Sequence, residues 1–195
     1  MSKPSLSTIR THIFGHPGAH PKEVASIFDG HLEQDPSLDC DLAIFAINPA
    51  IGIDAQSIAQ WEALDEAMVP RLVVVTGLDD SENDFDDAVL LANRVFDQTV
   101  TPFLVLHDDS GIACALISLS DLSIRDYSTT PPTLRDSDAE HKTLVSEFQS
   151  EYLNQMELMG DDAFGAGLVF PAIPIWLDRK IGVDIVTNYI ESLKN

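Results

Sequence analysis

Short apolar runs alternate along this chain with segments in which apolar residues recur every three or four positions. The apolar runs cover residues 8–14, 41–47, 72–75, 103–106 and 168–175. Between and after them, helical spacing predicts helices near 21–32, 54–68, 84–96 and 183–193. This alternation is typical of a mostly parallel sheet flanked by helices, so we expect all five runs in one predominantly parallel sheet.

The alternation is interrupted after residue 106. Two apolar runs, 112–119 and 122–127, follow each other closely and predict an antiparallel pair. A long polar segment, 138–159, then carries a narrow apolar stripe at helical spacing. We therefore divide the chain into a core of residues 1–110 and 165–195 and an inserted α+β subdomain of residues 111–164.

The charge balance is strongly acidic, with 11 Lys and Arg against 32 Asp and Glu and a net charge of −21. A field of this sign repels phosphate backbones and anionic membranes. We therefore expect no nucleic acid and no membrane as partner, and favour a protein partner, although acidity can also serve solubility alone. No apolar run reaches the ~18 residues of a membrane span. With no leader pattern at the N-terminus, we expect a cytoplasmic protein.

Residues 15–22 form the most informative loop of the chain. The sequence Gly15-His16-Pro17-Gly18-Ala19-His20-Pro21-Lys22 follows the first apolar run and precedes a predicted helix. A phosphate-binding P-loop in this place reads G-x-x-x-x-G-K-[ST]. Here His20 stands in place of the second glycine, Pro21 in place of the lysine and Lys22 in place of the hydroxyl. The frame of a nucleotide site is present without the residues that hold phosphate.

Residues 39–57 combine an aspartate, an apolar strand, a turn and Gly52-Ile53-Asp54-Ala55-Gln56-Ser57. They resemble the G domain of translation elongation factor G, which has Gly-Val-x-x-Gln-[Ser/Thr] at that place. Further matches follow in the same order: Val69-Pro70-Arg71, Asp79 in the Asn-Lys-x-Asp motif, and residues 171–182. The resemblance covers nearly the whole chain. It implies a P-loop GTPase-like α/β fold with the extra subdomain of that factor.

The departures from that family fall on its nucleotide-handling residues. Thr76 and Gly77 replace the asparagine and lysine of the base-recognition motif, and Trp176-Leu177 replace a Ser-Ala pair. The interval before Asp39 is too short for the two switch regions that the family places there. We therefore interpret the chain as a degenerate G domain that neither binds nor hydrolyses GTP, has no catalytic residues or cofactor, and acts as a protein-interaction module.

Two alternatives stay open for the vestigial site, which comprises Gly15, Gly18, His20, Lys22 and Asp79. It could hold GTP, GDP or another small ligand in a remodelled pocket, or it could serve an unrelated enzyme chemistry in the same cleft. A metal site is not expected. His12, His16 and His20 are spaced by four, but the intervening glycines and prolines prevent the helix that would align them.

Two partners are candidates for the interaction role. In the resembled family the extra subdomain meets the ribosomal stalk protein, which makes the polar helix 138–159 a candidate surface for a stalk-like protein. Self-association is the other candidate. The missing switch regions predict an open sheet edge beside strand 41–47, and open edges pair readily.

Overall fold

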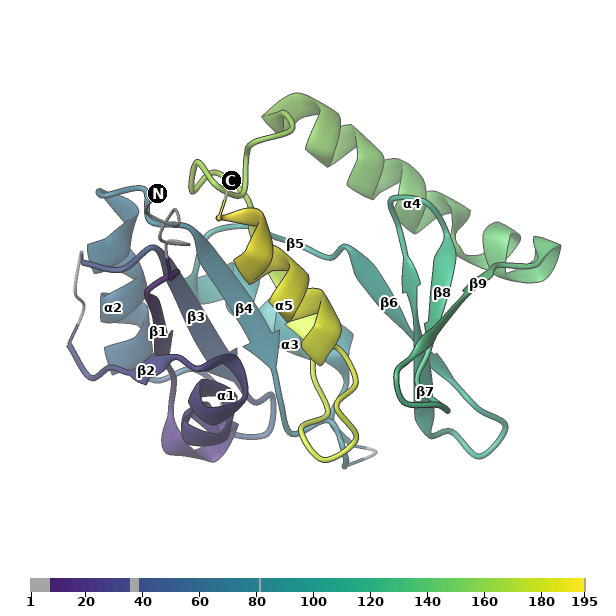
Figure 1. Ribbon diagram of the computed structural model, residues 1–195, viewed down its shortest axis with the longest axis horizontal. Helices are drawn as coiled ribbons and strands as arrows, with labels where there is room; N and C mark the ends of the chain where they lie inside the picture. Colours follow the sequence, from purple (N-terminus) through teal and green to yellow (C-terminus); the bar gives the residue numbers. More distant parts are fainter. Residues whose placement is uncertain (1–7, 36–38, 81, 195) are drawn as a thin grey trace, which may run out of the picture.

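The computed structural model describes residues 8–35, 39–80 and 82–194. These residues form two sheets that lie side by side, surrounded by helices (Figure 1). The larger sheet is parallel throughout, with the strand order β2-β1-β3-β4-β10-β5. Its strands are β1 (Thr11–Phe14), β2 (His31–Leu32), β3 (Leu42–Ile47), β4 (Arg71–Val75), β5 (Thr99–Val100) and β10 (Phe170–Pro174).

Helices cover both faces of this sheet. In Figure 1, α1 and α5 lie in front of it and α3 lies behind it. Every residue of β3, β4 and β10 is buried, which explains why their sequences are continuous apolar runs. Side chains of Asp54 and Asp84 cap α2 and α3 by accepting backbone hydrogen bonds. The helices are α1 (Pro21–Phe28), α2 (Ala55–Asp65), α3 (Phe85–Val95) and α5 (Val183–Ser192).

Aromatic side chains join α2 and the end of α3 to the sheet. The ring of Trp61 stacks on Phe96 with centroids 4.3 Å apart and meets Phe45 edge-on at 5.0 Å. The fully buried guanidinium of Arg71 lies 4.5 Å from the centroid of the Trp61 ring and pairs with Asp65 at 2.5 Å. Cation–π contact and ion pairing together compensate the burial of this charge.

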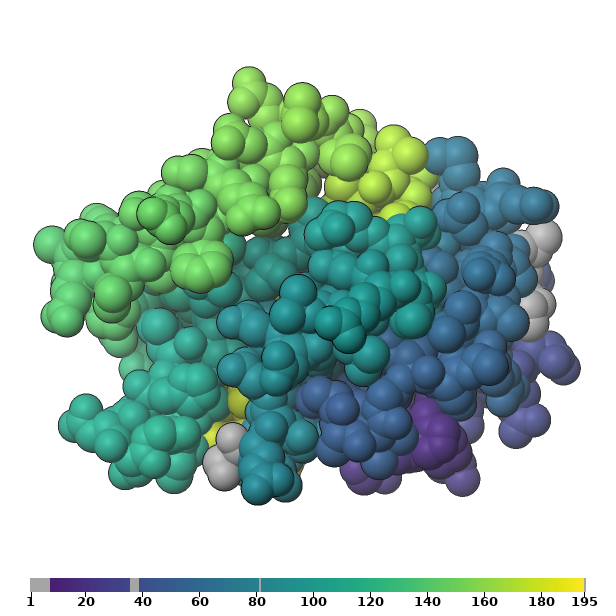
Figure 2. All heavy atoms as spheres, turned by 180° about the vertical axis from the view of Figure 1, so that it is seen from behind, coloured from purple at the N-terminus to yellow at the C-terminus, as the bar shows by residue number. Residues whose placement is uncertain are grey.

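The smaller sheet is antiparallel, with the order β6-β7-β8-β9. The predicted pair of strands is confirmed as β7 and β8, and the predicted polar helix is confirmed as α4 (Ala139–Met159), which begins after the capping side chain of Asp138. Buried contact between Ile124 and Val145 belongs to the cluster that joins α4 to the sheet. The strands are β6 (Phe103–His107), β7 (Ala113–Ser118), β8 (Ser123–Asp126) and β9 (Thr133–Asp136). Figure 2 shows α4, in green, along the rear of the molecule.

Four of the five predicted runs lie in the parallel sheet, as β1, β3, β4 and β10. The prediction for residues 103–106 is wrong, because this run is part of β6 and pairs antiparallel with β7. The two-residue β5 takes the place beside β10. Successive side chains of β6 point to two different apolar clusters, which explains why the run 103–106 is apolar throughout. Phe103 and Val105 pack on the main core, whereas Leu104 and Leu106 pack on the cluster of the smaller sheet.

The predicted open edge beside β3 is also wrong. Strand β1 pairs with β3 from Thr11 opposite Leu42 to Phe14 opposite Phe45, and β4 occupies the other side. The outer edge belongs instead to β2, because helix α1 ends earlier than predicted, at Phe28, where Asp29 adopts a left-handed backbone with φ 51°. The chain can then turn back and pair His31 with His12.

The division into residues 1–110 with 165–195 and residues 111–164 stays a prediction, and residues 1–7, 36–38 and 81 lie outside the described part. Within residues 8–35, 39–80 and 82–194, none of the helices combines the length and the apolar character needed to cross a membrane.

Candidate functional site

The loop that begins at Gly15 leaves β1 at the carboxyl edge of the parallel sheet. Gly15 has φ 143°, and a Cβ atom on it would lie 2.4 Å from the carbonyl oxygen of Ala46. Only glycine fits such a close backbone crossing in this conformation. Residues Pro17–Ala19 then form a single 3₁₀ turn, and α1 begins at Pro21.

Three successive amide donors of this loop, those of Gly18, Ala19 and His20, bond within the loop itself. The N–H of Gly18 donates to Nδ1 of His16 at 3.0 Å, and the N–H of Ala19 donates to the carbonyl oxygen of His16 at 2.8 Å. The N–H of His20 donates to the carbonyl oxygen of Pro17 at 3.1 Å. Pro17 and Pro21 have no N–H. The His16 imidazole therefore occupies a donor that an anion would need.

Two side chains at the ends of neighbouring strands fix the loop to the sheet. Asn48 follows β3, and its Nδ2 donates to the carbonyl oxygen of Gly18 at 2.9 Å. Thr76 follows β4, and its hydroxyl donates to the carbonyl oxygen of Ala19 at 2.8 Å. A Cβ atom on Gly18 would lie 2.9 Å from Cγ1 of Ile51, so this side chain covers the loop. Sequence reasoning missed Asn48 as an anchor, although its place directly after a buried strand is typical of such a role.

His20 and Lys22 lie where α1 begins. His20 has a left-handed backbone, and its half-exposed ring has Nδ1 3.6 Å from the carboxylate of Glu23. Lys22 lines a cavity of about 490 Å³ together with Gly15, opposite Asp54 and its neighbours at the start of α2. This cavity is the candidate for the remodelled pocket.

Asp79 lies at the same edge of the sheet but lines a different cavity, of about 370 Å³. Its carboxylate is 3.6 Å from Nη2 of Arg179, whose Nη1 donates to the carbonyl oxygen of Ala113 at 2.7 Å. The guanidinium also lies 5.4 Å from the ring centroid of Trp176, which is buried. The structure thus brings Gly15, Gly18, His20 and Lys22 together in one loop and places Asp79 beside an arginine instead.

The two cysteine thiols are held in their unreactive, protonated form. Burial raises the pKa of the Cys40 thiol to about 11 and also raises the pKa of Cys114, so both thiols are protonated at neutral pH. No group of three or more His, Cys, Asp or Glu side chains in the described part of the chain is arranged to hold a metal ion.

Known proteins include distant relatives of this chain, although no family model matches it. The chain is 26% identical over 165 residues to an elongation factor G-like protein of Mycobacterium tuberculosis, in a match that covers 74% of this chain and 22% of that protein. It is 23% identical over 145 residues to the mitochondrial ribosome-releasing factor 2 of Drosophila yakuba, in a match that covers 68% of this chain and 20% of the relative.

These matches define the chain as an α/β protein with distant homology to elongation factor G-like proteins, of which it spans about a fifth of the length. A crystal structure of a Thermus thermophilus protein supports the fold alone. It superposes with a TM-score of 0.69 at 16% identity, covering 96% of this chain and 40% of that one.

Proposed function

We propose that this protein is a degenerate G-domain-like relative of elongation factor G-like proteins that no longer binds or hydrolyses GTP and acts as a protein-interaction module. The observation that carries the proposal is the internal bonding of the loop 15–22. The N–H groups of Gly18, Ala19 and His20 all have partners inside the loop, so they cannot wrap a phosphate without breaking those bonds.

Electrostatics support the same conclusion. Each hydrogen bond between phosphate and a charged group contributes about 1.5–3 kcal/mol, and the position of the phosphate lysine is taken by Pro21. The net charge of −21 further lowers the local concentration of a polyanion. At the base-recognition end, Arg179 is 3.6 Å from Asp79 and therefore competes for the carboxylate that would bind a guanine.

An interaction role fits the surface that remains. Helix α4 buries only Val145 among its 21 residues and exposes Leu144, Phe148 and Leu158. Exposed apolar side chains on an acidic helix favour a protein partner over nucleic acid. A stalk-like protein is a candidate for this helix by analogy with the resembled family. Self-association is the less favoured candidate, because two copies would bring two charges of −21 together.

A second candidate function is binding of a small ligand in the cavity of about 490 Å³. Its support is the placement of Lys22 and Gly15 on one wall and the first turn of α2 on the other. Cavities of this size suit small molecules.

Calorimetric titration with GDP and GTP, each with and without Mg²⁺, tests the proposal. We expect no binding heat up to about 1 mM nucleotide, while an intact P-loop GTPase measured in parallel binds as usual. Micromolar binding of GDP would refute the proposal. The second candidate predicts instead that nucleotide binding is measurable, falls in Lys22→Ala and is unchanged in Lys142→Ala, an exposed lysine of α4.

A further inference from the structure

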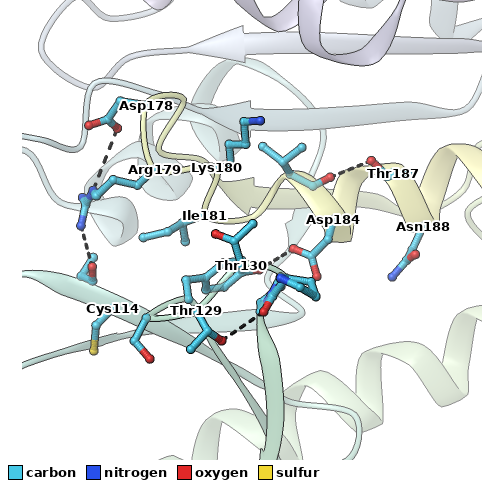
Figure 3. A pocket seen from close by; sticks show the side chains of 16 residues that line it. Cys114, Thr129, Thr130, Asp178, Arg179, Lys180, Ile181, Asp184, Thr187 and Asn188 are labelled. Carbon is cyan, nitrogen blue, oxygen red and sulfur yellow. Dashed lines mark hydrogen bonds and ion pairs between the residues drawn. The ribbon is translucent and has the colours of Figure 1, made fainter.

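A cavity of about 820 Å³ lies between the smaller sheet and the start of α5, away from the loop 15–22 (Figure 3). One wall is the segment 127–132, which joins β8 to β9, and the other is the segment 178–188. Apolar groups of Tyr127, Pro132 and Ile181 line it together with hydroxyl groups such as that of Thr130. This size and mixture of groups are typical of binding sites between structural units.

Hydrogen bonds join the smaller sheet and the segment after β8 to α5 and the loop before α5, and they hold these walls in place. The hydroxyl of Tyr127 donates to Oδ1 of Asp184 at 2.6 Å, and Nη1 of Arg125 donates to Oδ2 of the same carboxylate at 2.8 Å. Arg179 adds its 2.7 Å bond to the carbonyl oxygen of Ala113. Because these bonds are all within the protein, they position the walls themselves, and a ligand need not organise the cavity.

Strand β9 (Thr133–Asp136) is the open edge of the smaller sheet. It pairs with β8 on one side, and in the described residues no strand pairs with its other side. All of its residues are exposed. Such an edge presents unpaired N–H and C=O groups that can accept another strand.

One face of β9 is on the same side of the smaller sheet as the cavity. Leu134 is directly opposite Arg125 in the register of β8 and β9, and directly opposite residues share a face of the sheet. Arg125 reaches Asp184 at the cavity, so Leu134 is on the cavity side, and it is 63% exposed. Pro132, immediately before β9, lines the cavity itself.

We propose that β9 accepts an extended, positively charged segment of another protein as an added strand, with an apolar side chain of that segment on Leu134 and in the cavity. Main-chain hydrogen bonds would supply affinity and the cavity would supply specificity, as in other cases of strand addition. This proposal rests on the interaction role proposed above and adds to the α4 surface a second one, formed by β9 and the cavity, with the chemistry of its partner.

The charge distribution selects a cationic occupant over a second copy of this chain. Arg135 and Arg179 already lie within 4 Å of the carboxylates of Asp126 and Asp79, respectively. The last residue of β9, Asp136, places a further carboxylate on this edge. A partner strand with lysines is therefore attracted by the net charge of −21, whereas a second copy is repelled.

The test uses the full chain labelled with ¹⁵N and the peptide acetyl-Lys-Val-Thr-Leu-Thr-Val-Lys-amide as probe, followed by NMR titration and amide exchange. The control peptide has proline at its third and fourth positions, which removes an N–H from each edge of its strand. The protein variants are Leu134→Glu and, as a control, Leu90→Glu, an exposed leucine of α3. Both replace an exposed leucine, but Leu90 lies on α3, outside the surfaces proposed for binding.

We expect saturable binding that shifts and protects the amides of β9, and no binding of the control peptide. Binding should be about tenfold weaker in Leu134→Glu and within about twofold of wild type in Leu90→Glu. Non-specific attraction would instead be strengthened by either added carboxylate. That result, amide shifts confined to another surface, or no binding at about 1 mM peptide would overturn the proposal. A GDP titration of the same sample separately decides whether nucleotide binding is lost, because docking at β9 does not depend on it.

Discussion

The hydroxyl of Thr76 donates a 2.8 Å hydrogen bond to the carbonyl oxygen of Ala19 and so fixes the loop after β1 to the end of β4. Thr76 is 1% exposed, so water cannot replace this bond without a rearrangement of the sheet edge. In a sequence comparison this threonine is a departure from a guanine-recognition motif. In the structure it supports the loop.

Replacing Thr76 with valine should therefore destabilise the protein. The change keeps the branched shape, removes the donor and leaves a buried carbonyl group without its side-chain partner, so we expect a loss of about 1–2 kcal/mol in the free energy of unfolding. Urea denaturation measures it. The control, Thr143→Val, removes an exposed hydroxyl of α4 and should change stability by less than about 0.5 kcal/mol. Equal effects of the two substitutions would contradict the buried role of Thr76.

His16→Ala should open the loop locally. The substitution removes the acceptor of the Gly18 N–H, a capping bond that contributes about 1 kcal/mol. Amide exchange of Gly18 should become about fivefold faster, because its local opening then requires less free energy. In His141→Ala, where the lost imidazole belongs to the first turn of α4 and contacts its capping residue Asp138, the Gly18 amide should exchange as in wild type. Unchanged exchange in His16→Ala would show that the imidazole does not hold this amide.

Two glycine substitutions separate steric from conformational strain. Gly15→Ala places a Cβ atom 2.4 Å from a carbonyl oxygen at φ 143°, and we expect a loss of about 3 kcal/mol or more. Gly111→Ala has φ 77° but nothing within 4 Å of the new Cβ atom, so it should lose only about 1–2 kcal/mol. Thermal or urea denaturation of both variants tests this order, and a reversed order would rule out the close crossing of Gly15 and Ala46.

Stability should fall at alkaline pH through Cys40. Burial, reinforced by the nearby charge of Asp41, raises the pKa of the thiol from 9.0 to about 11. The folded state therefore holds this proton more tightly than the unfolded state, and the stability contribution present below pH 9 is lost as pH rises toward 11. Cys40 should therefore account for about 1–2 kcal/mol between pH 8 and 10.5.

The measurement for this prediction is urea denaturation of wild type and Cys40→Ala at both pH values under reducing conditions. The difference in unfolding free energy between the two proteins should shrink at pH 10.5, because the alanine variant lacks the titrating group. A difference that does not depend on pH would mean that the thiol ionises equally in both states.

The larger sheet was predictable because its strands are buried on both faces and are therefore continuously apolar. The same criterion misplaced β6. Its two rows of apolar side chains serve two different clusters, and a sequence pattern cannot distinguish that from double coverage by helices. Strand β9 carried no apolar signal at all, since each of its residues is exposed and only its pairing with β8 makes it a strand.

The loop 15–22 was predictable as a site by its frame, whereas its anchoring to the sheet was not. The carbonyl groups of Gly18 and Ala19 accept hydrogen bonds from Asn48 and Thr76, which are distant in sequence and belong to no motif that names them as anchors. The ion pair between Asp79 and Arg179 is equally a product of tertiary structure, because a 100-residue separation gives no local signal.

Strand β6 also determines how the molecule comes apart. Phe103 and Val105 belong to one cluster and Leu104 and Leu106 to the other, so neither sheet can lose its interior without disturbing the other. The bonds of Asp184 to Tyr127 and Arg125 reinforce this dependence. We therefore expect the two sheets to unfold together, so that the slowest-exchanging amides of both exchange through the same global unfolding event.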